Sequence, residues 1–198
     1  MKIRFSVHPL AAAGIFVVCA LMPPERSFGA LAAVLVHEAA HLFAGRSAGL
    51  SLRGVKLMPF GISFEMSAPR SYVEQIFVCA AGPVMNFTVC ALISSGVFPK
   101  SAACAELFAF SMAMAAVNTI PIRQLDGGEI LFATCSLLFG NAVSERILDI
   151  TSAVFTSLVW LTGVYIFFYD SENMALLAFS AFLFVAGFIN SDKKRNIT

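Results

Sequence analysis

The chain has 198 residues, of which 59% are hydrophobic and only 13% are charged. Soluble domains carry about a quarter charged residues and under half apolar ones, and a mean hydropathy of +0.83 excludes a disordered chain. The 13 Lys and Arg residues balance 12 Asp and Glu residues, so no basic excess exists for binding nucleic acid. The composition therefore predicts an all-α integral membrane protein that lies in the lipid bilayer and has no nucleic-acid partner.

Uncharged runs recur along the sequence at about the length of a transmembrane helix, which is roughly 20 mostly apolar residues. After the second run, residues of about 50–67 alternate between apolar and polar types on either side of a turn at Pro59-Phe60-Gly61. This pattern predicts a short membrane-associated β-hairpin. We expect one domain over residues 1–198 with six transmembrane helices, at about 7–22, 28–44, 72–97, 104–121, 147–169 and 174–189.

The distribution of positive residues predicts the orientation, because cytoplasmic loops carry an excess of Lys and Arg. With six spans, all of the 13 Lys and Arg residues except Arg26 and Lys100 fall on the face that holds both termini. This predicts a multi-pass protein of the cell membrane with cytoplasmic N- and C-termini. An open alternative is that Lys2, Arg4 and the first apolar run form a cleaved signal peptide, which leaves the direction of the second span unchanged.

The second predicted span contains three titratable side chains within the sequence His37-Glu38-Ala39-Ala40-His41. Such groups are costly inside a bilayer and indicate function. Because residues four apart share one face of a helix, His37 and His41 can direct both imidazoles at one ion. Glu38 is offset from that face and can reach a water beside the metal, which is the arrangement of the HExxH zinc motif. The alternative, a purely structural hydrogen-bonded cluster, is disfavoured by its cost in a bilayer.

A hydrolytic site with one Zn²⁺ per chain needs a third protein ligand. Asp126 follows the fourth predicted span, which runs in the same direction as the second, so the two segments can end at a similar depth. Pro121 ends the helix and Gly127-Gly128 permits a tight turn, so we expect Asp126 on non-helical backbone. Asp126 is therefore favoured over Glu129 and Asp149, which have no comparable turn chemistry around them.

Three motifs in this order resemble the site-2 protease family of intramembrane zinc metalloproteases: HExxH at 37–41, GPxxN at 82–86 and NxxPxxxLDGG at 118–128. The resemblance implies that His37, His41 and Asp126 bind zinc, that Glu38 is the catalytic acid/base and that Asn118 positions the substrate. The layout most resembles the branch of the stage IV sporulation protein FB. Members of that branch carry a CBS domain after the last span, whereas this sequence ends at Thr198, so a sporulation role and nucleotide control are not implied.

The sequence thus predicts an intramembrane zinc endopeptidase that cleaves a membrane protein substrate in or next to a transmembrane segment and releases a cytoplasmic regulator. Glu38 would accept a proton from water and return it to the leaving amine. The hairpin at 50–67 is expected either to pair with an extended substrate or only to cap the helices. Two other functions stay open, a catalytically silent membrane scaffold and a metal transporter that uses the same residues. A regulatory membrane partner and a homo-oligomer are both compatible with the sequence.

Overall fold

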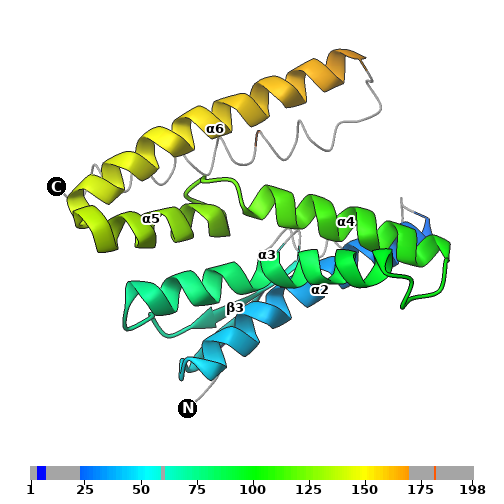
Figure 1. The fold of residues 1–198 in the computed structure, drawn as a ribbon, viewed down its shortest axis with the longest axis horizontal. Helices are drawn as coiled ribbons and strands as arrows, with labels where there is room; N and C mark the ends of the chain where they lie inside the picture. The colour runs from blue at the N-terminus through cyan, green and yellow to red at the C-terminus, as the bar shows by residue number, and fades with distance from the viewer. Residues whose placement is uncertain (1–3, 8–22, 59–60, 170–180, 182–198) are drawn as a thin grey trace. The chain divides into compact units, whose positions relative to one another are not determined.

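The computed structural model describes residues 4–7, 23–58, 61–169 and 181, and the chain forms two compact units, Met1–Thr119 and Ile120–Thr198. The elements of the first unit are β1 (Arg4–Val7), α2 (Pro24–Ser47), β2 (Leu52–Met58), β3 (Gly61–Met66), α3 (Tyr72–Ser94) and α4 (Ala102–Asn118). The elements of the second unit are α5 (Asp126–Phe139) and α6 (Asn141–Tyr169) (Figure 1).

The helices α2, α3 and α4 pack against one another in the first unit (Figure 1). Helix α2 begins with Pro24, whose fixed φ and missing N–H suit a first helical position. Helices α3 and α4 begin after Ser71 and Ser101, whose side chains accept hydrogen bonds from backbone N–H groups of the first turn. A Cβ on Gly29 of α2 would lie 2.7 Å from the carbonyl carbon of Glu106 on α4. The glycine therefore allows these two helices to approach closely.

A three-stranded sheet in the order β1-β2-β3 adjoins the end of α2. The predicted hairpin is confirmed as the antiparallel pair β2 and β3, while β1 pairs parallel with β2. Strand β1 was not predicted, and Val7, expected to open the first span, belongs to it. The polar and apolar alternation of Arg4–Val7 is a strand signal, but four residues gain their hydrogen bonds only from a partner strand far along the chain.

Two contacts attach the hairpin to the end of α2. The sulfur of Met66 on β3 lies where a Cβ on Gly45 would be, so the glycine admits this side chain against the helix. After the strand, Nη2 of Arg70 donates a hydrogen bond to the carbonyl oxygen of Gly49, at 3.1 Å. Gly49 has a φ of 77°, a left-handed conformation that favours glycine. The hairpin is thus held directly after the helix that carries the HExxH motif.

Three of the described helices are long and apolar enough to cross a membrane, and they correspond to the predicted spans 28–44, 72–97 and 147–169. The predicted span 104–121 is the apolar helix α4, whose 17 residues are fewer than the roughly 20 of a usual crossing. The predicted span 174–189 and, apart from Val7, the predicted span 7–22 lie outside the described residues. The number of six spans therefore stays a prediction.

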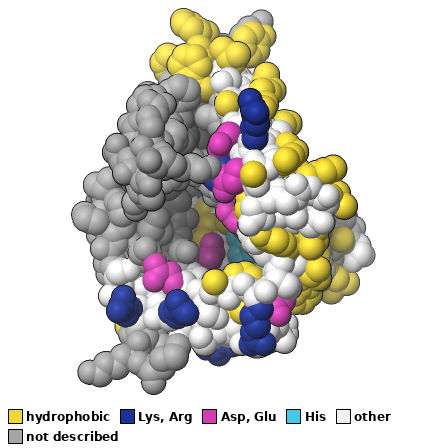
Figure 2. Space-filling model, turned by 90° about the vertical axis from the view of Figure 1, so that its left-hand side faces the viewer, with side chains coloured by type: hydrophobic (Ala, Val, Ile, Leu, Met, Phe, Trp, Pro, Cys, Tyr) yellow, Lys and Arg dark blue, Asp and Glu magenta, His cyan; other side chains and the backbone are white. Residues whose placement is uncertain are grey.

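The outward faces of these helices are apolar. Phe43 on α2 is 79% exposed and Phe168 on α6 is 83% exposed, and hydrophobic side chains gather on the upper and right-hand parts of the face drawn in Figure 2. Many of the buried residues are small or polar, such as Ala115, Asn86 and Ser111 at 0% exposed, although the large side chain of Leu148 is also buried, at 1%. Large apolar side chains outside and small or polar ones inside are typical of helices surrounded by lipid.

Helix α5 was not predicted. The stretch between the predicted spans 104–121 and 147–169 was expected to be a loop, but residues 126–139 form a helix that packs against α6. This helix has 14 residues, which are too few to cross a bilayer. Its sequence therefore does not have the length that identifies a transmembrane helix. It ends at Gly140, whose φ of 79° is the left-handed conformation that commonly closes a helix.

Candidate metal centre

The two histidines of the HExxH motif face each other on α2. Their Nε2 atoms lie 3.1 Å apart, and the ring planes are inclined by 81°. Two nitrogen ligands at about 2.0–2.1 Å from a tetrahedral zinc ion are themselves roughly 3.3 Å apart. The observed spacing therefore fits two ligands of one metal ion. His37 is buried and His41 is half-buried, so the pair lies inside the first unit.

One stripe of α3 covers both imidazoles. Val78, Gly82 and Asn86 are four residues apart and so lie on the same face of this helix. The backbone oxygen of Val78 lies 2.8 Å from Nδ1 of His41, and Nδ2 of Asn86 lies 3.3 Å from Nδ1 of His37. Each ring is thus held by α3 at its outer nitrogen, which leaves both Nε2 atoms directed at one place.

The contact with Val78 determines which nitrogen of His41 carries the proton. A backbone carbonyl can only accept a hydrogen bond, so Nδ1 of His41 is the donor in this 2.8 Å contact. The Nε2 atom of His41 then presents a lone pair. Metal-binding histidines commonly donate their other ring N–H to a carbonyl or a carboxylate in this way.

Gly82 allows α3 to pack closely against the two imidazoles. A Cβ at this position would lie 2.7 Å from Nε2 of His37 and in still closer contact with Nε2 of His41. The missing side chain therefore lets both ring nitrogens lie against the backbone of α3. The donor chemistry of two imidazoles suits zinc.

Glu38 is half-buried on α2, next to His37 in the chain. Successive residues of an α-helix are about 100° apart around its axis. Glu38 therefore lies on the flank of the histidine face, which is the position that the HExxH motif predicts for its carboxylate.

In the second unit, Asp126 is the first residue of α5. Leu125 precedes it at the N-cap position. The expectation that Asp126 lies on non-helical backbone is therefore wrong. The loop before it folds back over the first helical turn: a Cβ on Gly128 would lie 2.5 Å from the carbonyl carbon of Ile122. Gly128 is thus needed for this close approach. The resulting position at a helix N-terminus favours the negative charge of Asp126.

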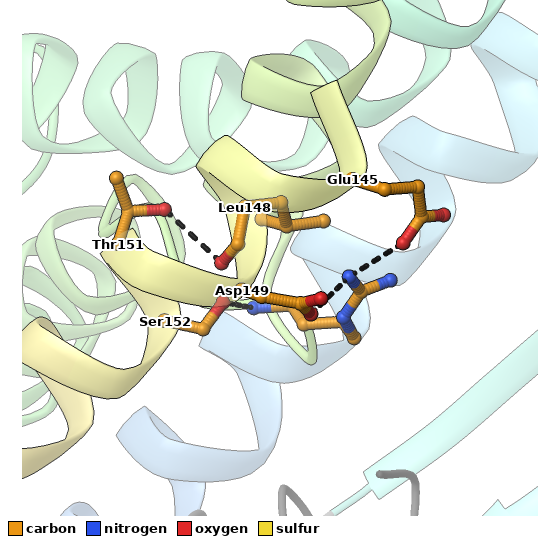
Figure 3. Close-up of polar contacts among 6 residues, drawn as sticks. Glu145, Leu148, Asp149, Thr151 and Ser152 are labelled. Carbon is orange, nitrogen blue, oxygen red and sulfur yellow. Dashed lines mark hydrogen bonds and ion pairs between the residues drawn. The ribbon is translucent and has the colours of Figure 1, made fainter. Parts of the chain in front are cut away.

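Arg123 connects the same loop to α6. One terminal nitrogen of its guanidinium lies 2.8 Å from Oε2 of Glu145 and 2.6 Å from Oδ1 of Asp149, and its backbone N–H donates to Oγ of Ser152 at 2.9 Å. Figure 3 shows Glu145 and Asp149 on successive turns of α6 with their carboxylates near this guanidinium. Burial lowers the pKa of Arg123, but hydrogen bonds and charge from the two carboxylates outweigh burial and raise the pKa. Asp149, a rival third ligand in the sequence analysis, is thus engaged in an ion pair.

Asn118, expected from the resemblance to position substrate, is the last residue of α4 and is half-buried. Its Nδ2 donates a hydrogen bond to the carbonyl oxygen of Met114 in the same helix, at 3.0 Å. This bond uses one of the two N–H groups of the amide and orients the side chain along α4. A role toward substrate therefore stays a prediction.

The residues of α3 that hold the histidines were not assigned to the site from the sequence. Gly82 and Asn86 entered only as part of the GPxxN motif, and Val78 contributes a backbone atom, which no side-chain pattern reveals. In the sequence, residues 78, 82 and 86 have the same four-residue spacing as the two histidines. This spacing indicates a contact between the two sets of residues only once α3 is known to pack against α2.

Comparisons with known proteins agree with this picture. Residues 100–162, which include Asn118 and Asp126, match the family model described as Peptidase family M50. Over 162 residues, 78% of this chain, the sequence is 28% identical to Stage IV sporulation protein FB of Bacillus subtilis (strain 168). The resemblance to the site-2 protease family is confirmed. The chain spans about half of the length of that curated relative, since the alignment covers 54% of it.

The fold is similar to that of a solved structure. The solved structure described as Site-2 Protease from Methanocaldococcus jannaschii is similar with a TM-score of 0.68, over 94% of this chain and 91% of that chain. The two sequences are 22% identical over this match, so this likeness establishes the fold alone. Two distant sequences therefore share this fold.

Proposed function

We propose that this chain is an intramembrane zinc endopeptidase that hydrolyses peptide bonds in or next to transmembrane segments of a membrane protein and releases a cytoplasmic regulator. The observation that carries the proposal is the pair of Nε2 atoms of His37 and His41, which lie 3.1 Å apart while α3 contacts the other nitrogen of each ring. This site lies within apolar helices, where such groups are costly unless they have a function. The M50 match and the site-2 protease fold support the same activity.

In this proposal one Zn²⁺ is held by His37, His41 and Asp126. Two imidazoles and a carboxylate form a common ligand set of zinc hydrolases, which keep a fourth position open. The choice of Asp126 rests on its place at the start of α5 after the tight loop, and on the ion pair that engages Asp149. When bound, zinc makes water more acidic and polarises the carbonyl under attack.

Glu38 is assigned as the catalytic acid/base. Its carboxylate accepts the proton of the attacking water and delivers it to the nitrogen of the leaving amine. The ring of His41 does not compete for this proton, because Nδ1 of His41 is engaged with the oxygen of Val78 and Nε2 faces the metal position. Asn118 is assigned to positioning the substrate.

A substrate segment must be extended before cleavage, since the backbone of an intact helix is shielded by its own hydrogen bonds and side chains. Among the described strands, β3 is an edge of the sheet, because β1 pairs with the other side of β2. An unwound substrate can add a strand to this edge through backbone hydrogen bonds. The close attachment of the sheet to the end of α2 supports this role. The distribution of Lys and Arg supports cytoplasmic termini.

The test compares the wild-type protein with Glu38→Gln and with Glu25→Gln, a matched change at an exposed glutamate in the first turn of the same helix. Purified proteins in detergent are assayed for zinc content and for cleavage of fluorescently labelled casein and of a tagged single-span membrane protein. We expect about one zinc per chain in all three proteins. Glu38→Gln should lower cleavage at least about 100-fold, because general acid/base catalysis contributes that much or more, whereas Glu25→Gln should cleave normally.

Other outcomes separate the competing functions. Normal cleavage by Glu38→Gln would remove Glu38 from the mechanism. Zinc binding by a wild-type protein that cleaves neither probe would favour a silent scaffold. Zinc flux into vesicles that persists in Glu38→Gln would favour a transporter.

A further inference from the structure

Asn86 has a buried amide with one unpaired atom next to the histidine pair. The residue is 0% exposed, and its Oδ1 has no hydrogen-bond partner within the described part of the chain. A buried oxygen left without a partner costs about 1–3 kcal/mol. The Nδ2 atom of the same amide lies 3.3 Å from Nδ1 of His37. The unpaired oxygen is therefore part of a group that already contacts a proposed ligand.

The contact between Nδ2 of Asn86 and Nδ1 of His37 is compatible with only one neutral tautomer of His37. An amide nitrogen can only donate, so Nδ1 of His37 accepts here and its ring proton lies on Nε2. A proton on Nε2 prevents that nitrogen from binding a metal. The metal-binding tautomer carries its proton on Nδ1 and needs an acceptor at the place that Nδ2 of Asn86 occupies. A half-turn of the amide brings Oδ1 to that place, because the oxygen and nitrogen of an amide have nearly the same shape.

We propose that Asn86 is a positioning residue for His37 in the zinc-loaded protein: its Oδ1 accepts a hydrogen bond from Nδ1–H and thereby directs Nε2 at the metal. This inference rests on the proposed zinc function. The oxygen of Val78, 2.8 Å from Nδ1 of His41, holds that ring in the same way. With the amide turned, α3 supplies one acceptor to each histidine. The usual side-chain acceptor in such pairs is a carboxylate. A neutral amide adds no further negative charge inside the membrane, where charge is costly.

The experiment measures zinc affinity in purified full-length protein by competition with a chelator, for Asn86→Leu and Asn86→Asp. Asn86→Leu removes the acceptor, and we expect roughly 10–100-fold weaker zinc binding, the usual cost of losing such a partner. Asn86→Asp keeps an oxygen acceptor and loses the donor, so its affinity should stay within about threefold of wild type. The absorption spectrum of the Co²⁺-loaded protein reports whether the ligand geometry changes in parallel.

Cys90→Ala is the matched control. Cys90 lies one turn further along the same stripe of α3, is 3% exposed, and its Sγ contacts the carbonyl oxygen of Phe108 rather than a histidine. This variant should bind zinc like the wild type. Thermal unfolding of all the metal-free proteins separates a lost acceptor from a general loss of packing.

Two results would overturn the inference. Asn86→Leu could lower the unfolding temperature of the metal-free protein while its zinc affinity stays unchanged, which would make Asn86 a structural residue. Asn86→Asp could lose zinc affinity tenfold or more, which would show that the amide N–H group is required instead of the oxygen. If Asn86→Leu does not fold, the zinc affinity of Asn86→Asp alone tests the inference. A wild-type protein that binds no zinc would remove the proposed function itself, whereas failure of the inference requires a wild-type protein that binds zinc.

Discussion

Substitution of Gly82 by alanine tests whether the close packing of α3 against the two histidines holds them in the metal-binding arrangement. The added methyl group would lie 2.7 Å from Nε2 of His37 and 2.6 Å from Cε1 of the same ring, and in closer contact with Nε2 of His41. Carbon atoms in protein interiors pack at about 3.5–4.0 Å from their neighbours. Helix α3 or the imidazoles must therefore move by roughly 1 Å, away from the arrangement in which both Nε2 atoms meet.

The expected size of the effect differs between the metal-free and the metal-loaded protein. Overpacking in a well-packed interior costs about 1–3 kcal/mol, while alanine is favoured over glycine within a helix by about 1 kcal/mol. The metal-free protein can relax, so its stability should change by at most about 2 kcal/mol. The metal-loaded protein can relax less, because both Nε2 atoms must stay directed at one ion. A cost of about 1–3 kcal/mol in binding free energy corresponds to roughly 10–100-fold weaker zinc affinity, at tenfold for each 1.4 kcal/mol.

The assay is chelator competition for zinc on Gly82→Ala, together with thermal unfolding without metal. Gly29→Ala is the matched control, because a Cβ there would meet the backbone of Glu106 at 2.7 Å, in a contact between α2 and α4 that involves neither histidine. We expect Gly29→Ala to lower stability and to leave zinc affinity within about twofold of wild type. Zinc binding by Gly82→Ala at wild-type affinity would refute the role of this packing in arranging the two zinc ligands.

Two further predictions concern the second unit. Asp126→Ala should lower the zinc content to well below one per chain in mass spectrometry of dialysed protein, since two imidazoles alone bind zinc weakly, whereas Glu129→Gln on the same helix should keep it; unchanged metal content in Asp126→Ala would mean that another residue is the third ligand. Arg123→Ala should destabilise the protein by about 1–2 kcal/mol in thermal unfolding, because two carboxylates of α6 lose a shared, partly exposed cation. Arg146→Ala, at an exposed position of α6, serves as its control, and equal unfolding temperatures for these two arginine variants would contradict the role of Arg123.

Features that depend on local sequence were predictable. Composition and uncharged runs indicated a membrane protein, and three predicted spans correspond to long apolar helices. Alternation on both sides of a turn predicted the hairpin of β2 and β3. The spacing of His37 and His41 placed both rings on one face of α2, where their Nε2 atoms lie 3.1 Å apart. In each case the periodicity of a single element carries the information.

Features that depend on contacts between distant segments were not predictable. Strand β1 exists through its parallel partner β2, and Asp126 begins a helix too short to resemble a span. The stripe of Val78, Gly82 and Asn86 acquires a function only because α3 lies against the histidine face of α2. The sequence by itself thus determined the type of protein and the residues that can bind a metal, since these follow from local spacing and hydrophobicity. Only the tertiary structure decided which groups orient those residues, because hydrogen bonds and close packing between helices depend on distances that a single sequence does not contain.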